Sequence, residues 1–287
     1  MSAATPYLDP HVHLWTRDAA EPFWMCQKID ALDRDFTLEA LGRLQDAAGV
    51  GGAIAVQAMT DVAESERLLD LAQASPRLAG VVAWADLLDP ALGERVAAYR
   101  TRPKFAGIRP LPPDTFGGDW LGDARSAAAL DTLRSLDCCV DLLARVEDLP
   151  RLRALVRRIP GLRAVLNHAG RPAVMTGDTA AWRREMIAFA RETGAVVKCS
   201  GLVERAGVEW TAASITPWVA GLIEAFGPKR VMFATNWPVM TISANYGLWV
   251  RTLAAILEEL GLAAEERDDV MWRTAATTYR VAWPPAG

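Results

Sequence analysis

The sequence predicts a single-domain (β/α)8 barrel, the TIM-barrel fold, over residues 1–287. Short apolar runs alternate with longer helical patterns about eight times along the chain, which is the number of strand and helix units that such a barrel requires. The length of 287 residues also suits one barrel, since this fold commonly takes ~250 residues. An open doubly wound sheet is the second choice, and neither a G-x-G-x-x-G fingerprint nor a Walker loop supports a nucleotide-binding version of it.

The first half of the chain carries four expected strands. Residues 9–15 form the first, followed by a long aromatic-rich loop and a helix from Thr37 through Ala48 that Gly49 ends. Asp61 and Glu64 then form a capping-box-like start to the next helix. The strands of this half are expected at 9–15, 53–58, 80–86 and 105–109, and a further helix at 90–100.

The second half repeats the pattern. Its strands are expected at 138–143, 164–168, 195–200 and 230–236. Pro150 fits the first turn of the helix that follows the fifth strand. Helices rich in Leu, Ala, Arg and Glu separate the strands, and a final helix is expected at 265–279. Neighbouring Cys138 and Cys139 are interpreted as small apolar core residues.

Composition excludes several classes of protein. Lys and Arg number 31 against 35 Asp and Glu, a net charge of −4 without long runs of one sign, so a nucleic-acid or membrane-surface partner is not expected. No apolar run approaches ~20 residues, and the N-terminus lacks the regions of a signal peptide, so we expect a cytoplasmic protein. The four cysteines contain no C-x-x-C pair and suggest neither a zinc knuckle nor a disulfide framework.

The stretch Asp9-Pro10-His11-Val12-His13-Leu14-Trp15 is the most informative one. Side chains alternate faces along a strand, so His11 and His13 are expected to share one side. Neutral imidazole is a good metal ligand and exchanges protons near neutral pH. The pattern is short and by itself also fits core histidines. However, the chain has only three histidines, and two of them are here.

Polar residues stand at the end of nearly every expected strand. In a parallel barrel these ends meet at the functional face. Stability alone explains one or two such residues but not a set of this size. We therefore expect a site formed by His11, His13, Gln57, Trp84, Asp86, Arg109, Asn167, His168, Lys198, Ser200 and Asn236.

Six motifs together resemble the amidohydrolase-2 branch of the amidohydrolase superfamily, and within it the L-fuconolactonase-like sugar-lactone hydrolases. The resemblance spans nearly the whole chain and implies a TIM barrel that hydrolyses a small cyclic ester. The motifs are the run 9–15, Val56-Gln57-Ala58, Gly107-Ile108-Arg109, Leu166-Asn167-His168-Ala169-Gly170, Lys198-Cys199-Ser200-Gly201-Leu202 and Met232-Phe233-Ala234-Thr235-Asn236-Trp237-Pro238-Val239.

The resemblance assigns roles to five residues. His11 and His13 match the family's first-strand pair, and His168 matches its sixth-strand histidine. Arg109 matches a substrate-gripping arginine, whose planar guanidinium suits a carbonyl, hydroxyl or carboxylate. Trp237 matches the tryptophan of the family's Ser-Asp-Trp-Pro motif.

Asn236 departs from that motif, because the family has its proton-transferring aspartate there. A carboxylate can take a proton from water, whereas a carboxamide can only form hydrogen bonds. Three explanations stay open. Asn236 is a substitution made to trap a bound ligand, or it is natural and a histidine acts as the base, or the protein catalyses something other than hydrolysis. The first is slightly favoured, because an amide of the same shape leaves the site geometry nearly intact.

The metal content also stays open. Binuclear members of the superfamily add a fifth-strand histidine and often a bridging carboxylated lysine from the fourth strand. Asp141 and Arg109 stand on those strands here, so a binuclear centre is not expected. His11, His13 and His168 could hold one Zn²⁺ with an open position for water, or act without metal as some lactonase relatives are implied to do. We expect either no required metal or one weakly bound zinc ion.

Lys198 and the aromatic residues each have two interpretations. Lys198 could stabilise a developing oxyanion, or be a buried ammonium paired to Asp141 or Asp86. The aromatic side chains could stack on a ring substrate or simply pack over the barrel mouth. They are Trp15, Phe23, Trp24, Trp84 and Trp237.

The expected function is hydrolysis of a small lactone by water attack on its carbonyl. His11, His13 and His168 would position water and polarise the carbonyl, and position 236 would pass a proton to the leaving alkoxide. The alternatives are a metal-dependent decarboxylase or hydratase of the same branch, acting on an aromatic or unsaturated acid, and a non-catalytic ligand binder. The Trp- and Leu-rich stretch 243–262 is a candidate surface for a second copy in a homo-oligomer.

Overall fold

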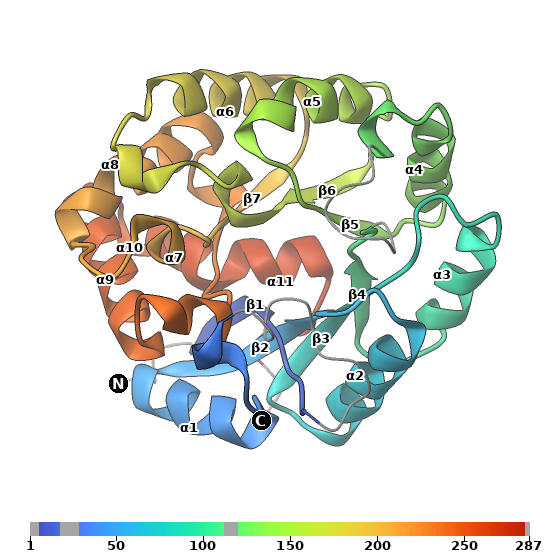
Figure 1. The fold of residues 1–287 in the computed structure, drawn as a ribbon, viewed down its shortest axis with the longest axis horizontal. Coiled ribbons are helices and arrows are strands. Elements are labelled where there is room, and N and C mark those ends of the chain that lie inside the picture. The colour runs from blue at the N-terminus through green and yellow to red at the C-terminus, as the bar shows by residue number, and fades with distance from the viewer. Residues whose placement is uncertain (1–5, 18–28, 112–119, 285–287) are drawn as a thin grey trace.

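Eight parallel strands, each hydrogen-bonded to the next in chain order, occupy the centre of the protein (Figure 1). The structure is a computed structural model that describes residues 6–17, 29–111 and 120–284. The expected barrel is confirmed. Its strands are β1 (Tyr7–Val12), β2 (Val50–Val56), β3 (Leu78–Ala83), β4 (Phe105–Ile108), β5 (Cys139–Leu142), β6 (Arg163–Leu166), β7 (Val196–Cys199) and β8 (Val231–Phe233).

Helices surround the strands, and Figure 1 shows them as an outer ring. Asp61 caps the second helix as expected, Thr37 caps the first, and Gly49 ends the first in a left-handed conformation with φ 71°. The helices are α1 (Leu38–Ala48), α2 (Val62–Ala74), α3 (Leu92–Arg100), α4 (Arg125–Ser135), α5 (Leu149–Arg157), α6 (Ala180–Glu192), α7 (Val203–Ala206), α8 (Ala212–Phe226), α9 (Tyr246–Glu259), α10 (Ala264–Asp268) and α11 (Thr274–Tyr279).

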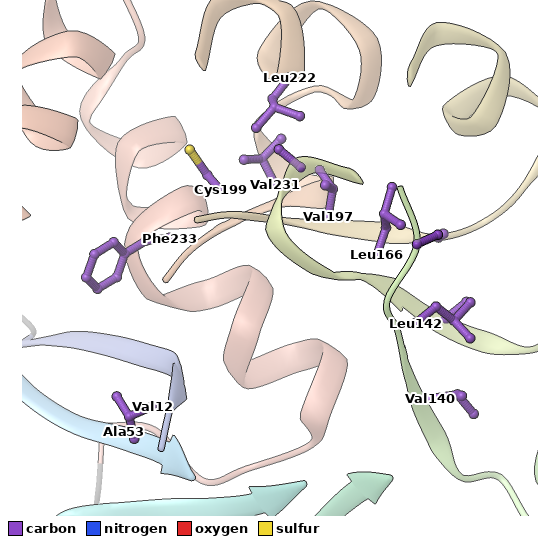
Figure 2. Packing of buried hydrophobic residues seen from close by; sticks show 14 of the residues in the cluster. Val12, Ala53, Val140, Leu142, Leu166, Val197, Cys199, Leu222, Val231 and Phe233 are labelled. Atoms are coloured by element: carbon purple, nitrogen blue, oxygen red, sulfur yellow. The ribbon is translucent and has the colours of Figure 1, made fainter. Parts of the chain in front are cut away.

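Two apolar clusters hold the barrel together. The larger one lies between the strands and the helices. Figure 2 shows part of it, where Leu222 of α8 lies near Val231 of β8. The smaller cluster contains Leu8, Ile54, Val82 and Met232 from four strands, and Ala275 and Tyr279 of α11 complete it. In Figure 1, α11 crosses the centre of the view, so the last helix covers one end of the barrel interior.

The strands end earlier than the sequence predicted. Regular pairing stops at Val12, Ala83 and Phe233, whereas the apolar runs suggested ends near 15, 86 and 236. His168 and Asn236 have left-handed backbones with φ 54° and 59°, which a strand cannot contain. Most of the expected site residues therefore stand on the turns that follow the strands.

The final helix is confirmed over 264–279, where a π-helical segment, Asp269–Arg273, joins α10 to α11. Most large side chains of the stretch 243–262, which was the candidate surface for a second copy, are buried within the protein. Tyr246, Trp249 and Leu253 of α9 are buried against the barrel, which leaves Leu248 as the exposed large apolar residue there. Within the described residues, no helix combines the length and apolar character needed to cross a membrane.

Glu64 does not complete the capping box that the sequence suggested. Its carboxylate accepts hydrogen bonds from the backbone N–H groups of Ala58, at 2.9 Å, and Met59, at 2.8 Å, just beyond β2. Asp61 caps α2 without it, through the N–H of Ala63. Glu64 therefore ties the start of α2 to the turn that follows β2. Burial raises its pKa to about 7.

Replacing Glu64 with alanine is expected to lower the free energy of unfolding by about 2 kcal/mol at pH 5, because two buried N–H groups lose their acceptor. The loss should be smaller at pH 8. The raised pKa means that the folded protein binds the proton more tightly, so the Glu64 contribution falls as pH rises from about 4.5 to about 7. Urea unfolding at both pH values measures this. Glu94→Ala, an exposed change on α3, is the control, and an equal effect of both variants would contradict the assignment.

Candidate active site

Hydrogen bonds between the end of β1 and the turn that follows β8 bring the His-x-His stretch beside Asn236. The N–H of Asn236 donates to the carbonyl of His11 at 3.0 Å, and the N–H of His13 donates to the carbonyl of Trp237 at 2.7 Å. Asp9 reinforces this seam, since its carboxylate accepts from the hydroxyl of Thr235 at 2.6 Å and from that of Tyr246 at 3.0 Å. Barrel closure thus creates the site.

His11 and His13 point at each other. Their Nε2 atoms are 3.2 Å apart, and His13 Nδ1 lies 2.9 Å from the carbonyl of Val56. That carbonyl can only accept, so His13 carries its proton on Nδ1 and has a lone pair on Nε2. On the other side, the ammonium of Lys198 lies 3.0 Å from His11 Nδ1. An ammonium can only donate, so His11 carries its proton on Nε2 and donates toward His13.

This pattern does not fit a three-histidine zinc site. Zinc binds the lone pair of a neutral imidazole, and the Nε2 lone pair of His11 is taken by a proton as long as Lys198 donates to Nδ1. His168 directs its Nδ1 at the hydroxyl of Ser200, 2.9 Å away. In the ranges 6–17, 29–111 and 120–284, no group of three or more His, Cys, Asp or Glu side chains is arranged to hold a metal ion.

His168 enters the site through an unusual backbone. Both His168 and Ala169 are left-handed, with φ 54° and 51°, and they turn the chain sharply after β6. His168 Nδ1 lies 2.9 Å from Ser200 Oγ, and its ring centroid is 4.5 Å from that of His11. Gly201 lets the turn after β7 approach this closely, since a Cβ there would lie 2.5 Å from the Cβ of His168.

All three histidines are neutral at pH 7. Burial lowers the pKa of His13 to about 3, and the positive charge of Arg109 adds to the shift. Burial likewise places the pKa of His11 and of His168 well below 6.5, assisted by Lys198 for His11 and by Arg109 for His168. Such rings can donate or accept a hydrogen bond but are weak bases.

Lys198 is fully buried inside the barrel. It is an ammonium paired with Asp141, which was the second of its two interpretations. Its ammonium donates to Asp141 at 2.6 Å, to the carbonyl of Pro10 at 2.9 Å and to His11. Asp141 in turn accepts from the hydroxyl of Tyr279 at 2.5 Å. These contacts use all three ammonium hydrogens, so none is directed at an oxyanion. Lys198 holds His11 in place.

Arg109 and Gln57 form a pair at the mouth of the barrel. The guanidinium of Arg109 donates to the backbone carbonyl of Gln57 and, at 3.0 Å, to its side-chain oxygen. Nε of Arg109 is buried and has no hydrogen-bond partner among the residues that the structure describes. Burial lowers the pKa of Arg109 to about 10, so it is charged at pH 7. Gln57 lies behind Arg109 and orients it, rather than lining the cavity as the sequence suggested.

A cavity of about 510 Å³ opens at this face. Ala58, Leu111, Leu143, Val239 and Ile242 provide apolar wall. Its polar wall consists of His13, Arg109, His168, Arg171, Glu204, Arg205 and Asn236. Four of these were expected from the sequence. His11 lies directly behind His13, and Lys198 lies behind His11.

Three cavity residues, Arg171, Glu204 and Arg205, were not predicted. All belong to turns and short helices beyond the strand ends. Glu204 is on α7, and its Oε1 accepts from Asn236 Nδ2 at 2.6 Å. A detectable signal existed, because loops that follow barrel strands build the functional face, and each of these residues follows a predicted strand by only a few positions.

The expected aromatic platform is absent from the described cavity wall. The indole N–H of Trp15 donates to the carbonyl of Arg34 at 3.0 Å, and that of Trp84 donates to the carbonyl of Leu111 at 2.8 Å. Trp237 packs edge-on against Phe36 with ring centroids 5.3 Å apart. These rings support the mouth of the barrel by packing, which was the alternative interpretation. Phe23 and Trp24 lie outside the described residues.

Comparison with known proteins agrees with this architecture. Residues 8–281 match the family model described as amidohydrolase. The chain is 34% identical over 290 residues to an L-fucono-1,5-lactonase of Burkholderia multivorans, covering 96% of this chain and 97% of that protein. It is 31% identical over 280 residues to an L-fucono-1,5-lactonase of Burkholderia ambifaria, covering 96% of each.

The fold has a close match among solved structures. A crystal structure of an amidohydrolase from Burkholderia multivorans with bound zinc has a TM-score of 0.87 and 33% identity, covering 96% of this chain and 100% of that chain. The family match spans most of the sequence, and the fold and the strand-end histidines agree with it. The chain therefore belongs to the amidohydrolase-2 family.

Proposed function

We propose that this protein hydrolyses a sugar lactone or a similar small cyclic ester by attack of water on the carbonyl carbon. The observation that carries the proposal is the cavity itself. It collects one buried arginine, two neutral histidines and an amide paired with a carboxylate beside an apolar wall. Two curated relatives at 31% and 34% identity are L-fucono-1,5-lactonases, which supports this substrate class.

Arg109 holds the substrate in this proposal. Its charge and its unpartnered Nε are suited to a carbonyl or hydroxyl oxygen, and Gln57 keeps the guanidinium in place. A positive group beside the carbonyl also stabilises the negative charge that develops on its oxygen. Arg171 and Arg205 extend the positive wall of the cavity around the ring substituents.

The histidines orient the reacting groups. Contact between His168 Nδ1 and the Ser200 hydroxyl leaves the other ring nitrogen of His168 to hydrogen-bond substrate or water. His13 lines the cavity with its Nε2 lone pair engaged by the N–H of His11, and His11 and Lys198 hold its ring in position from behind. Asn236 forms hydrogen bonds at the same wall but cannot take a proton.

No step of this mechanism uses a metal ion. A relative has been crystallised with zinc, but the hydrogen bonds of His11 in this chain do not suit a metal ligand. When purified without added metal, the protein is expected to contain less than stoichiometric zinc and to keep its kcat/KM within about twofold after treatment with a chelator.

A panel of sugar 1,5- and 1,4-lactones, followed with a pH indicator before and after chelation, tests both points. Turnover of at least one lactone is the expected result. Tightly bound stoichiometric zinc together with loss of activity on chelation would contradict the metal-free mechanism. Release of CO₂ from an aromatic acid without lactone turnover would favour a decarboxylase. Calorimetric binding of lactones without turnover would favour a binding protein.

A further inference from the structure

The cavity contains a carboxylate that the sequence motifs did not reveal. Asn236 stands where the family motif has aspartate, and the pKa of His13, about 3, makes that ring a weak base. Among the described residues that line the cavity, Glu204 is the acidic one. It is the second residue of α7, the short helix that follows β7 and the Ser200-Gly201 turn.

Glu204 is placed beside the position of the missing aspartate. Its Oε1 accepts from Asn236 Nδ2 at 2.6 Å, and the same Asn236 side chain interacts with His13. Within the part of the chain that the structure describes, its second oxygen, Oε2, is buried and has no hydrogen-bond partner. A carboxylate with one oxygen fixed and the other unpaired at a cavity wall can accept a hydrogen bond from water. The Asn236 amide therefore orients Glu204 and leaves Oε2 for a reactant.

We propose that Glu204 is the general base and acid of the hydrolysis, in place of a carboxylate at position 236. This inference rests on the lactone hydrolysis proposed above. Glu204 Oε2 takes a proton from water while the water oxygen bonds to the carbonyl carbon, and the carbonyl π pair moves to its oxygen. The tetrahedral intermediate then collapses. Its carbon–ring-oxygen bond breaks, and the proton on Glu204 passes to the leaving alkoxide, giving a hydroxy acid that ionises in solvent.

The charges around Glu204 suit this role. Burial raises its pKa above the ordinary 4.5, while the hydrogen bond from Asn236 and the charge of Arg205 oppose the rise. His13, His168, Arg109 and Arg171 line the same cavity, and the two histidines are neutral at pH 7. A raised pKa strengthens a carboxylate as a base. Because the base must be ionised, kcat/KM should fall as pH falls through the pKa of Glu204.

Asn236 has a defined part in this arrangement. An aspartate at 236 would bring two carboxyl groups into contact at about the present 2.6 Å, and both could not be ionised there at once. An amide removes the repulsion and donates a hydrogen bond instead. The Asn236–Glu204 pair thus moves the carboxylate from the end of β8 to α7, on the same wall of the cavity.

Four proteins test the proposal with the lactone that the parent hydrolyses best. They are the parent, Glu204→Gln, Asn236→Asp and the double variant Glu204→Gln/Asn236→Asp, with Glu209→Gln as a control at an exposed position of the next turn. Glu204→Gln should lower kcat by about 10²- to 10⁴-fold with KM changed by only a few fold, and it should lose the acidic limb of the pH profile. Melting temperatures should stay close to that of the parent.

The double variant separates catalysis from positioning. It restores one carboxylate at the neighbouring position, so it should recover at least tenfold of the activity lost in Glu204→Gln. A merely positioning Glu204 would give no such recovery, and that result would overturn the proposal. Full activity of Glu204→Gln with a gain in Asn236→Asp would also overturn it and leave the lactonase function standing. Absence of lactone turnover in all proteins would instead refute the proposed function itself.

Discussion

Replacement of His168 with alanine is expected to lower kcat/KM for lactone hydrolysis by about 10²- to 10³-fold, the usual effect of removing a polarising group from a water-excluded site. The ring is 4.5 Å from that of His11, its Nδ1 contacts Ser200, and it lines the cavity beside Arg109. Steady-state kinetics on the best lactone, with circular dichroism and melting curves, measure the effect.

The backbone at His168 requires a matched control. Its φ of 54° suits His and Asn better than Ala, so His168→Ala carries a small strain cost of about 1 kcal/mol in addition to the lost ring. His168→Asn keeps a residue that accepts this conformation and should melt near the parent temperature while remaining as inactive as the alanine variant. An unfolded His168→Asn protein would show that the ring serves the core, and an active one would remove His168 from the mechanism.

The fold could be predicted because its signals are local and repeated. Each buried strand is a short apolar run, and the longer helices have a capping residue or an apolar stripe. The predicted number of eight strands is therefore correct, although individual strand ends were wrong by several residues. Those errors have one physical cause. At Ala83 and Phe233 the backbone leaves the sheet although apolar residues follow directly, Trp84 and Ala85 after the first and Ala234 after the second, so composition alone does not mark the end of pairing.

The site was only partly predictable, because its contents depend on which atoms meet. Strand-end position identified His13, Arg109, His168 and Asn236 as cavity residues. Position could not show whether a polar side chain faces the cavity or the barrel interior. Lys198 is placed by a partner 57 residues away in the sequence, Asp141, and that pairing exists only after the barrel closes.

Glu204 is a cavity residue that the sequence did not indicate at all. It lies on a four-residue helix that no periodicity predicts, and its relevance appears only through the contact with Asn236, 32 residues later. The departure at position 236 was visible in the sequence, and three explanations for it could be stated. A neighbouring carboxylate was not among them, because the turn after β7 had not been placed beside the end of β8.

Lys198→Met is expected to be the most destabilising of these variants, at about 3–5 kcal/mol in urea unfolding, because it leaves Asp141 buried without its cation. Removing one partner of a fully buried pair costs more than the pair contributes, since the remaining charge keeps its full desolvation penalty. Tyr279 still donates to Asp141 but is neutral. Lys104→Met is the matched control. Lys104 donates to the backbone carbonyls of Ala72 and Ser75 and pairs with no carboxylate of the described residues, and a loss of about 1 kcal/mol is expected.

The double variant Lys198→Met/Asp141→Leu separates stability from activity. With both charges gone, most of the lost stability should return, because two apolar side chains of similar size replace the buried pair. Activity should stay at least tenfold below the parent. Without the ammonium, nothing fixes the His11 proton on Nε2. The hydrogen bonds from Lys198 to His11 and from His11 to His13 then no longer have a fixed donor and acceptor. A double variant that regains both stability and kcat/KM would show that the ion pair serves only the core. A stable variant with impaired turnover would mean that the interior of the barrel sets the protonation of the site above it.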